Sequence, residues 1–386
     1  MSDREAFLEE ALEERKQNYR FRSLSPLKPS GIIVNKEGNS YIDFSSNDYL
    51  GLAGHPDIIQ KSEEYLQAYG AGSRASRLIS GTYEIHSRLE EQFAGVFDSE
   101  AALLFNSGFQ ANSTILGTVT SRHSLILADK LSHSSLLQGS LSSRADFQRF
   151  SHNDTVHLRA LLQKAQEQNY DRIWIITESI FSMNGDRSPL NEISALAEEF
   201  DAWLFVDDAH AAGVWGEKGL GLAKNIPNID ILLGTCGKAF GSFGAYVICS
   251  QKMKEYLVNF CPGFIYTTAL PPAVIGATRA ALDLIPTLQE EREKFHQNIE
   301  FFCQSARELG FDTGLSSTQI IPLIVGDDQE ALQLSDWLRE NGILATAIRP
   351  PTVPREQSRI RVSLSSRHTK KQLKKFLNTL KNWNHE

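Results

Sequence analysis

The sequence predicts an α/β protein with a large, mostly parallel-sheet domain and a smaller α+β domain. From about Ser99 onward, short apolar runs alternate with amphipathic helical patterns, which is typical of a parallel sheet covered on both faces. Near Leu270 the pattern changes to a long polar helix, alternating strands and a basic last helix. The apolar runs that predict the first sheet are Ala101–Phe105, Ser124–Ala128, Ile173–Thr177, Ala202–Val206 and Ile231–Leu233, and the later strands are Gln319–Val325 and Arg359–Leu364.

Three segments follow from these patterns: residues 1–50, a large domain over 51–270 and a smaller domain over 271–386. The first segment opens with a helix that has Phe7, Leu8, Ala11 and Leu12 on one face and ends near 22–26. A hairpin over 31–44 follows, with its turn at 36–39. We expect these fifty residues to pack beside the smaller domain. The polar helix is expected to run from Ala273 to about Leu309.

The composition is that of a globular protein, because 41% of the residues are hydrophobic and 22% are charged. Thirty-nine Lys and Arg residues stand against 47 Asp and Glu, a net charge of -8. This excess of acid argues against a general nucleic-acid binder, which needs basic residues to neutralise phosphates.

No apolar run approaches the roughly 20 residues that a membrane-spanning helix needs. The N-terminal stretch is acidic and lacks the basic and apolar regions of a secretory signal. Four cysteines, without framework spacing or a C-x-x-C pair, indicate reduced thiols: Cys236, Cys249, Cys261 and Cys303. We therefore expect a cytoplasmic protein.

Polar or glycine-rich residues follow five consecutive predicted strands. Ligand sites in parallel sheets form outside the carboxyl ends of the strands, so this pattern predicts an active-site rim. The glycine turn after the first of these strands opens a helix, whose exposed N–H groups suit a phosphate. The strand ends carry 106–112, then Asp129 and His133, then Glu178 and Ser179, then Asp207, Asp208 and His210, and finally Gly234–Gly241.

The sequence gives less support to a metal site, a P-loop or a dinucleotide-binding loop. Asp207, Asp208 and His210 have no second His or Cys at metal-ligand spacing, so no metal site is expected. Gly234–Gly241 fails as a P-loop because Leu232 stands where the first glycine is needed and Ala239 follows the lysine. Gly70–Ser73 lacks the strand, helix and acidic partner of a dinucleotide-binding loop.

A lysine in a glycine-rich segment remains, about thirty residues after an aspartate at a neighbouring strand end. Pyridoxal phosphate enzymes need this set: a lysine that binds the cofactor, a carboxylate that keeps the pyridine nitrogen protonated, and hydroxyls with a helix N-terminus for the phosphate. The two residues are Lys238 and Asp207. By itself this spacing is only a moderate signal, because lysines and acids are common.

Longer stretches resemble the α-oxoamine synthases, fold-type I pyridoxal phosphate enzymes that condense an amino acid with an acyl thioester. The resemblance extends from near Arg22 to Arg361. It implies a fold-type I transferase with pyridoxal 5'-phosphate as cofactor. The matching stretches are Asp43–Leu52, Asp129–Ser135, Glu178–Asp186, Val206–His210 and Gly234–Gly241.

The resemblance also implies roles for individual residues. Lys238 would hold the cofactor and move the α-proton, Asp207 would pair with the ring nitrogen, and His133 would stack on the ring and orient the substrate carboxylate. The other cofactor contacts implied are Gly108, Phe109, Ser179, His210 and Thr235, with Thr267 or Thr268 reaching the phosphate of a partner subunit. The substrate contacts implied are Arg22 and Thr352 along the acyl channel, Asn47 near the reacting carboxylate, and Arg361 as the carboxylate clamp. Arg359 is a rival for that clamp because alternate residues of a strand share a face.

Two segments, Ser76–Gly81 and Ala347–Pro354, are similar to the branch that condenses L-alanine with a pimeloyl thioester to 8-amino-7-oxononanoate in biotin synthesis. Arg355–Gln357 departs from that branch, which often has a glycine there. The acyl donor would be a coenzyme A or acyl-carrier-protein thioester, and the family implies a homodimer. A glycine-using acetyltransferase, a 5-aminolevulinate synthase and a non-catalytic interaction subunit of the same fold are the alternatives.

Overall fold

The computed structural model describes residues 4–383, which form two compact units. The larger unit contains residues 47–182 and 187–293. The smaller unit contains the segment that ends at Ser46, residues 183–186 and the segment that begins at Lys294. Within the described residues, no helix has both the length and the apolar character to cross a membrane.

The larger unit is built on a seven-stranded sheet with strand order β4-β10-β9-β8-β7-β5-β6. Every neighbouring pair is parallel except the two pairs that β10 makes, with β4 and β9. The strands are β4 (Ala101–Phe105), β5 (Ser124–Asp129), β6 (Asp146–Phe150), β7 (Arg172–Glu178), β8 (Trp203–Asp207), β9 (Ile231–Thr235) and β10 (Ala245–Cys249). The predicted α/β class with a mostly parallel sheet is therefore confirmed.

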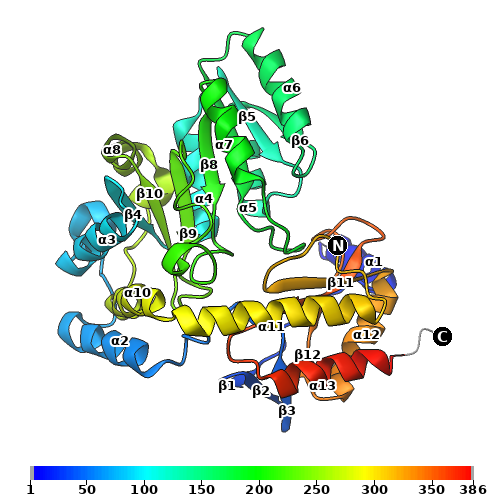
Figure 1. The fold of residues 1–386 in the computed structure, drawn as a ribbon. Coiled ribbons are helices and arrows are strands. Elements are labelled where there is room, and N and C mark those ends of the chain that lie inside the picture. Colours follow the sequence, from blue (N-terminus) through cyan, green and yellow to red (C-terminus); the bar gives the residue numbers. More distant parts are fainter. Residues whose placement is uncertain (1–3, 384–386) are drawn as a thin grey trace. The chain divides into compact units, whose positions relative to one another are not determined.

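Helices cover both faces of this sheet, with α7 in front of the strands and α4 behind them in Figure 1. This double cover explains why β4 and β5 are buried along their whole length and are mostly apolar. The helices are α2 (Pro56–Tyr69), α3 (Glu84–Val96), α4 (Gly108–Val119), α5 (Ser134–Ser142), α6 (Thr155–Gln166), α7 (Leu190–Glu199), α8 (Gln251–Phe260), α9 (Pro262–Ile265) and α10 (Pro272–Leu284), with a π-helical turn η1 (Arg77–Gly81) and 3₁₀ turns η2 (Glu217–Gly219) and η3 (Ile285–Thr287).

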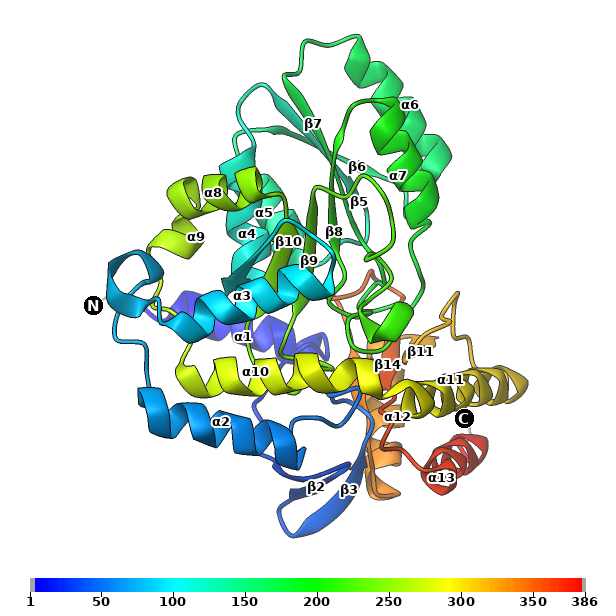
Figure 2. The same ribbon diagram turned by 60° about the vertical axis from the view of Figure 1, so that its left-hand side comes forward.

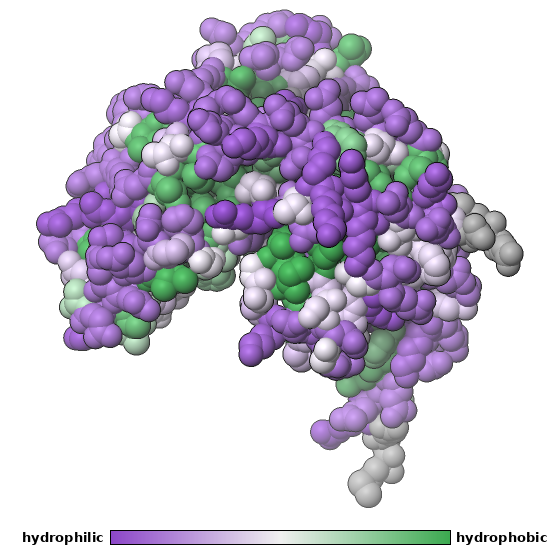
Figure 3. Space-filling view, turned by 60° about the horizontal axis from the view of Figure 1, so that its bottom comes forward, coloured by the Kyte–Doolittle hydropathy of each residue, from purple (hydrophilic) through white to green (hydrophobic). Residues whose placement is uncertain are grey.

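Side chains from the sheet and the helices behind it meet in one core, which includes Ile126, Trp174, Phe205, Leu233 and Ile115. The surface is different. Hydrophilic side chains cover most of the face shown in Figure 3, and hydrophobic ones are confined to smaller patches.

The smaller unit holds two short sheets, with orders β1-β2-β3-β12 and β11-β14-β13. The predicted hairpin is β2 paired with β3, and β3 then pairs in parallel with β12 near the other end of the chain. The elements are α1 (Ala6–Gln17), β1 (Lys28–Ser30), β2 (Ile33–Lys36), β3 (Asn39–Asp43), α11 (Gln289–Glu308), β11 (Ile320–Gly326), α12 (Asp328–Glu340), β12 (Ile343–Leu344), β13 (Thr346–Ile348), β14 (Ser358–Ser363) and α13 (Lys370–Lys381). Residues 289–293 of α11 belong to the larger unit.

The helix expected from Ala273 to about Leu309 is interrupted. Pro286 has no backbone N–H, and the chain forms the 3₁₀ turn η3 there, between α10 and α11. Figure 2 shows α10 lying along α2. A Cβ atom on Gly276 of α10 would lie 2.4 Å from the Lys61 carbonyl oxygen, so only glycine permits this close approach of the two helices. This packing groups α10 with the larger unit, whereas the sequence placed that helix with the C-terminal domain.

The first helix is shorter than expected and ends at Gln17. Asn18 stops it by donating from its side chain to the Glu14 carbonyl at 2.8 Å, and Tyr19 follows with a left-handed φ of 56°. Its predicted apolar face is exposed, with Phe7 67% accessible and Leu12 50% accessible.

His368 holds the hairpin to the C-terminal part of the smaller unit. Its Nδ1 accepts from the Ser365 N–H at 2.9 Å, so Nε2 carries the proton and donates to the Asp43 carbonyl at 3.0 Å. The ring stacks on Phe44 with a centroid distance of 4.0 Å. Burial lowers the pKa of His368 to about 4. A neutral imidazole is therefore part of this core.

We predict that His368 makes stability depend on pH below neutrality. Below about pH 6.5 the unfolded histidine takes up a proton and the folded one does not, so the stabilisation is complete above that pH and is lost as the pH falls towards 4. The loss is expected to reach about 3 kcal/mol, at roughly 1.4 kcal/mol per pH unit. Urea unfolding at a series of pH values measures it.

His368→Gln should flatten this dependence, and exposed His123→Gln is the control. An equally steep decline in His368→Gln would contradict the assignment.

Candidate active site

The carboxyl ends of β4, β5, β7, β8 and β9 open onto one cavity in the larger unit. Its lining contains most of the larger-unit residues proposed from the sequence: Asn47, Gly108, Phe109, His133, Asp207, His210, Thr235 and Lys238. Ser107, Asn112, Ser135, Glu178, Ala209, Gly237, Phe243 and Gly244 complete it. Residues as far apart in the chain as Asn47 and Gly244 therefore share one cavity, because parallel strands end at the same edge of the sheet.

Lys238 lies in the loop between the antiparallel strands β9 and β10. The loop is closed by the Gly241 N–H, which donates to the Lys238 carbonyl at 2.9 Å, and by the Ser242 N–H, which donates to the Cys236 carbonyl at 2.9 Å. Lys238 is half-buried. The loop therefore presents the amine from a fixed backbone.

Asp207 ends β8 and is only 7% exposed. Its Oδ2 accepts from the Asn112 side chain at 2.7 Å, and its Oδ1 accepts from the Ala209 N–H at 3.0 Å. Each carboxylate oxygen therefore has a hydrogen-bond donor. Asp207 is thus suited to hold a cationic ring nitrogen.

A chain of hydrogen bonds connects Asp207 to His133. Asn112 also donates to Ser135 Oγ at 3.0 Å, and Ser135 Oγ lies 2.7 Å from His133 Nδ1. His133 Nδ1 accepts from the Ser135 N–H at 3.3 Å, so the proton of the neutral ring is on Nε2. Burial lowers the pKa of His133, despite the opposing charge of Asp207. The imidazole is therefore neutral near pH 7.

Glu178, at the end of β7, is 2% exposed and accepts from the His133 N–H at 2.5 Å. Burial, then the nearby charge of Asp207, raise the pKa of Glu178 well above its usual value. The side chain fixes the start of α5, where His133 is the N-cap residue.

Asp208 lies behind the cavity and supports the turn after β8. Burial raises its pKa to about 7. Gly221 has a φ of +101°, and a Cβ there would lie 1.8 Å from Asp208 Oδ2, so only glycine lets this segment pass the carboxylate.

Tyr49 lies beneath His210 and is fully buried. Its hydroxyl is 2.7 Å from His210 Nδ1 and 3.0 Å from Asn47 Oδ1. A hydroxyl carries one proton but accepts two more hydrogen bonds, so it can order both neighbours at once. Tyr49 therefore links two residues that line the cavity.

The first turn of α4 forms one wall. Ser107 caps this helix by accepting from the Gln110 N–H at 3.1 Å, and the N–H groups at Gly108 and Phe109 begin it. A Cβ on Gly108 would lie 2.6 Å from the Thr235 methyl carbon, so this close approach requires glycine. A helix N-terminus beside a hydroxyl is a suitable phosphate site.

Comparison with known proteins identifies the family. The class I and II aminotransferase family model matches residues 39–380. A putative 8-amino-7-oxononanoate synthase of Desulfosudis oleivorans is 45% identical over 98% of each chain. An 8-amino-7-oxononanoate synthase of Gluconacetobacter diazotrophicus is 44% identical over 97% of this chain and 96% of that one. The chain belongs to the α-oxoamine synthase family of pyridoxal-phosphate-dependent acyltransferases.

Solved structures agree. A serine palmitoyltransferase with pyridoxal phosphate has a TM-score of 0.92 at 25% identity, over 98% of both chains. The 8-amino-7-oxononanoate synthase of Francisella tularensis has a TM-score of 0.76 at 30% identity, over 88% of this chain and 97% of that one. The fold is therefore fold-type I, as the sequence predicted.

The cavity fits the cofactor of this family. The amine of Lys238, the buried Asp207 carboxylate and the N-terminus of α4 supply the three groups that the cofactor requires. Thr235 Oγ1 and Asn112 Oδ1 are buried without a hydrogen-bond partner among the described residues, which leaves polar capacity facing the cavity.

Three proposed cofactor residues of the larger unit lie outside the cavity lining. Ser179 is fully buried, and its N–H donates to the Asp207 carbonyl at 2.9 Å, so it supports Asp207 from behind. Thr267 Oγ1 and the Thr268 carbonyl both accept from the side chain of Asn106. The proposed roles of all three residues remain predictions.

The proposed substrate residues of the smaller unit fall into two pairs. Arg22 donates to Thr352 Oγ1 at 2.9 Å, which joins two residues separated by 330 positions. Arg359 and Arg361 both lie on β14 and are 3% and 7% exposed. Arg359 donates to Asn184 Oδ1 at 2.8 Å and to the Met183 and Gln357 carbonyls, whereas Arg361 donates to Ser363 Oγ at 2.6 Å.

Sequence reasoning missed Tyr49, Asn112 and Ser135 as parts of the site. Tyr49 and Ser135 stand inside the stretches that carry the family resemblance, which was an available signal. Asn112 was named within the turn after β4, but nothing local shows that its amide reaches Asp207, 95 positions away.

We predict that Tyr49→Phe weakens cofactor binding about ten-fold, because loss of a buried hydrogen bond costs roughly 1–3 kcal/mol. It should also shift the pH dependence of the visible absorbance of the bound cofactor, since His210 loses its partner. Titration of the apoenzyme with pyridoxal phosphate measures the first effect, and spectra across pH measure the second.

Tyr246→Phe is the matched control. Tyr246 is also fully buried in the larger unit, and its hydroxyl has no hydrogen-bond partner among the described residues. If Tyr49→Phe behaves like Tyr246→Phe in both measurements, Tyr49 does not act on the site.

Proposed function

We propose that this α-oxoamine synthase condenses L-alanine with a pimeloyl thioester, releasing carbon dioxide and the free thiol and giving 8-amino-7-oxononanoate for biotin biosynthesis. The observation that carries the proposal is the cavity that joins Lys238, Asp207, His133 and His210 in a chain 41–45% identical to proteins named 8-amino-7-oxononanoate synthase. The similarity of Ser76–Gly81 and Ala347–Pro354 to that branch supports the choice of substrates.

Pyridoxal phosphate supplies a protonated ring that takes up electron density from the α-carbon of the bound amino acid. Lys238 holds the cofactor and then moves the α-proton with its Nζ. Asp207 keeps the proton on the ring nitrogen, and the Asn112 and Ala209 donors hold its carboxylate in place.

Two histidines contact the cofactor ring. His133 acts as a neutral imidazole, and His210 acts as a hydrogen-bonding group. His133 presents the face of a neutral imidazole and a proton on Nε2, suited to a substrate carboxylate. His210 contacts the ring hydroxyl oxygen while Tyr49 holds its Nδ1. The N–H groups of Gly108 and Phe109, with the Thr235 hydroxyl, bind the phosphate.

Recognition of the two substrates is assigned to separate groups. Arg361 clamps the alanine carboxylate, for which a guanidinium is well shaped. Arg359 is the rival candidate on the same strand, and its guanidinium donates to Asn184, Met183 and Gln357. Arg22 and Thr352 lie along the acyl chain, and Asn47 lies near the reacting carboxylate.

A homodimer is part of the proposal. Large apolar side chains are exposed on the larger unit, with Ile79 79%, Phe109 49%, Phe243 55% and Tyr266 84% accessible. Phe109 and Phe243 line the cavity itself. Surfaces of this kind mark interaction sites. A second copy would cover them, and Thr267 or Thr268 would reach the phosphate of the partner's cofactor.

A panel of substrates tests the reaction. We expect kcat/KM for alanine with pimeloyl-coenzyme A to exceed that for glycine with acetyl- or succinyl-coenzyme A by about a hundred-fold, and mass analysis to find 8-amino-7-oxononanoate. Lys238→Ala is the control and should lose turnover. Preference for glycine would assign the chain to an acetyltransferase or 5-aminolevulinate synthase activity instead. No turnover with any pair, and no cofactor bound through lysine, would favour the interaction subunit.

The clamp is tested by a pair of variants. Arg361→Ala should weaken alanine binding about ten- to a hundred-fold, because a lost hydrogen bond to a charged group costs roughly 1.5–3 kcal/mol. Binding of the acyl thioester should change far less. Titration with alanine, followed by the visible absorbance of the bound cofactor, measures the effect.

Arg359→Ala is the comparison and should lower the unfolding midpoint instead, since its contacts hold residues 183–184. If Arg359→Ala loses alanine affinity and Arg361→Ala does not, the clamp is Arg359. If neither does, Asn47 and His133 become the candidates.

A further inference from the structure

The last helix, α13, carries a basic surface on an otherwise acidic chain. The segment Lys370–Lys381 contains no Asp or Glu, whereas the whole chain has a net charge of -8. Its five lysines are all exposed: Lys370, Lys371, Lys374, Lys375 and Lys381. The charge of this helix is therefore opposite to that of the protein.

The helix is fixed by its other face. Leu373, Phe376 and Leu380 are buried, and Thr369 caps the N-terminus by accepting from the Gln372 N–H. At 3.6 residues per turn, the lysines and Asn378 occupy an arc of about 140°, and they extend along roughly 16 Å of helix. The folded smaller unit thus presents the lysines outward along a rigid element.

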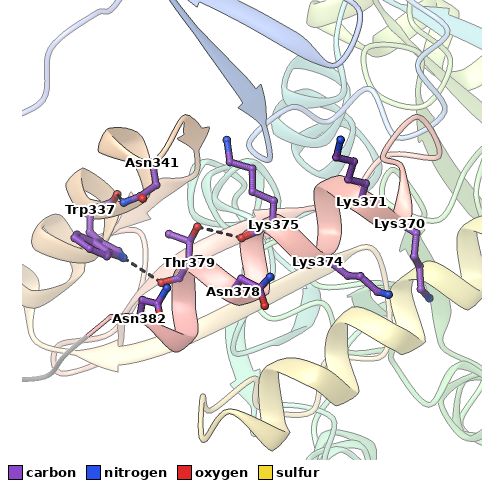
Figure 4. Close-up of a pocket in the computed structure, with 9 residues that line it drawn as sticks. All are labelled: Trp337, Asn341, Lys370, Lys371, Lys374, Lys375, Asn378, Thr379 and Asn382. Atoms are coloured by element: carbon purple, nitrogen blue, oxygen red, sulfur yellow. Dashed lines mark hydrogen bonds between the residues drawn. The ribbon is translucent and has the colours of Figure 1, made fainter.

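A groove runs between α13 and the end of α12. Trp337 of α12 and its C-cap residue Asn341 form one side, and the Trp337 indole donates to the Thr379 carbonyl at 3.1 Å. Figure 4 shows Lys371 and Lys375 extending from one side of α13, and Lys370 and Lys374 from the other. The amines diverge and do not enclose one small ligand.

The charge of these lysines is not neutralised by any described carboxylate within 4.0 Å. Lys370 lies over the Phe301 ring, with Nζ 3.5 Å from its centre. On α12, Arg339 forms an ion pair with Asp336 of the same helix. A partner with acidic groups would therefore gain ionic contacts that the described chain itself does not provide.

We propose that the basic face of α13 docks the acidic surface of an acyl-carrier protein that delivers the acyl thioester. The inference rests on the proposed function, since that reaction requires a thioester donor. Lysines spread over roughly 16 Å and on two sides of a helix match a protein surface better than the few phosphates of one coenzyme A molecule. Nucleic acid is disfavoured because the net charge of -8 repels an extended polyanion.

Ionic contacts of exposed lysines act mainly on the first encounter between the two proteins. They raise the association rate and set the orientation of the partner, and they weaken as salt screens them. The expected signature is thus a change in kcat/KM for the carrier-bound donor that depends on ionic strength.

The test compares two donors of the same acyl group, pimeloyl-coenzyme A and pimeloyl loaded on a purified bacterial acyl-carrier protein. In the holoenzyme, Lys371→Glu/Lys374→Glu should lower kcat/KM for the carrier-bound donor about ten-fold at low salt. With pimeloyl-coenzyme A the change should stay within about two-fold, and Lys371→Gln/Lys374→Gln should show a smaller loss of the same kind. The control Lys164→Glu/Lys252→Glu makes the same change in net charge at exposed positions of α6 and α8.

Direct binding gives a second measurement. Fluorescence anisotropy of the labelled, loaded carrier should show weaker binding to the Lys371→Glu/Lys374→Glu variant, and the difference should disappear at high salt. A labelled DNA duplex that binds α13 more tightly than the carrier would assign the surface to nucleic acid and overturn the proposal.

The outcomes separate the two proposals. Turnover of pimeloyl-coenzyme A but not of the carrier-bound donor overturns the docking surface and leaves the reaction intact. Equal losses with both donors, or no loss with either, also overturn it. No turnover of either donor by the wild-type holoenzyme refutes the proposed function, and the docking surface with it.

Discussion

The site depends on one carboxylate, that of Asp207, which is almost completely buried. Removing a carboxylate from water costs several kcal/mol unless donors and an opposite charge compensate. Asn112 and the Ala209 N–H supply the donors, and the protonated ring of the cofactor supplies the charge. Asn112 comes from the second turn of α4, whose first turn forms the phosphate site. In the proposed site, one helix would thus position both ends of the cofactor.

Two further carboxyl groups lie close to Asp207, and their pKa values separate their roles. Burial raises the pKa of Glu178 well above its usual value and that of Asp208 to about 7. Three neighbouring carboxylates would repel one another if all were ionised. Asp207 has a donor at each oxygen, while Glu178 orders His133 and Asp208 orders the turn after β8.

The sequence predicted the sheet because buried parallel strands have a strong local signal, namely apolar runs separated by helices. It also predicted which strand ends open onto one cavity. It missed β6, whose residues are mostly partly exposed and polar, and β10, which pairs antiparallel with β4 and β9. Missing β10 hid the reason for the glycines around Lys238: they form the connection between two antiparallel neighbours.

Contacts between residues that lie far apart in the sequence could not be predicted from the sequence. Tyr49 and His210 are separated by 161 positions, and their hydrogen bond depends on how two segments of the folded unit meet. The same holds for Asn112 and Asp207. The exposure of α1 was also beyond prediction, because an amphipathic pattern shows that a face is apolar but not what covers it.

The chain passes from one unit to the other in the loop after β7. The bridge between Ile180 and Arg187 belongs to the larger unit, while residues 183–186 between them belong to the smaller unit. Gly185 makes this possible: its φ is +67°, a Cβ there would lie 1.8 Å from the Ile320 carbonyl oxygen, and its own carbonyl accepts from Thr318 Oγ1 at 2.8 Å. The loop begins just after Glu178, and its other end is held by Arg359 of β14. A strand that carries the proposed carboxylate clamp is thus joined by a few residues to the strand that orders His133.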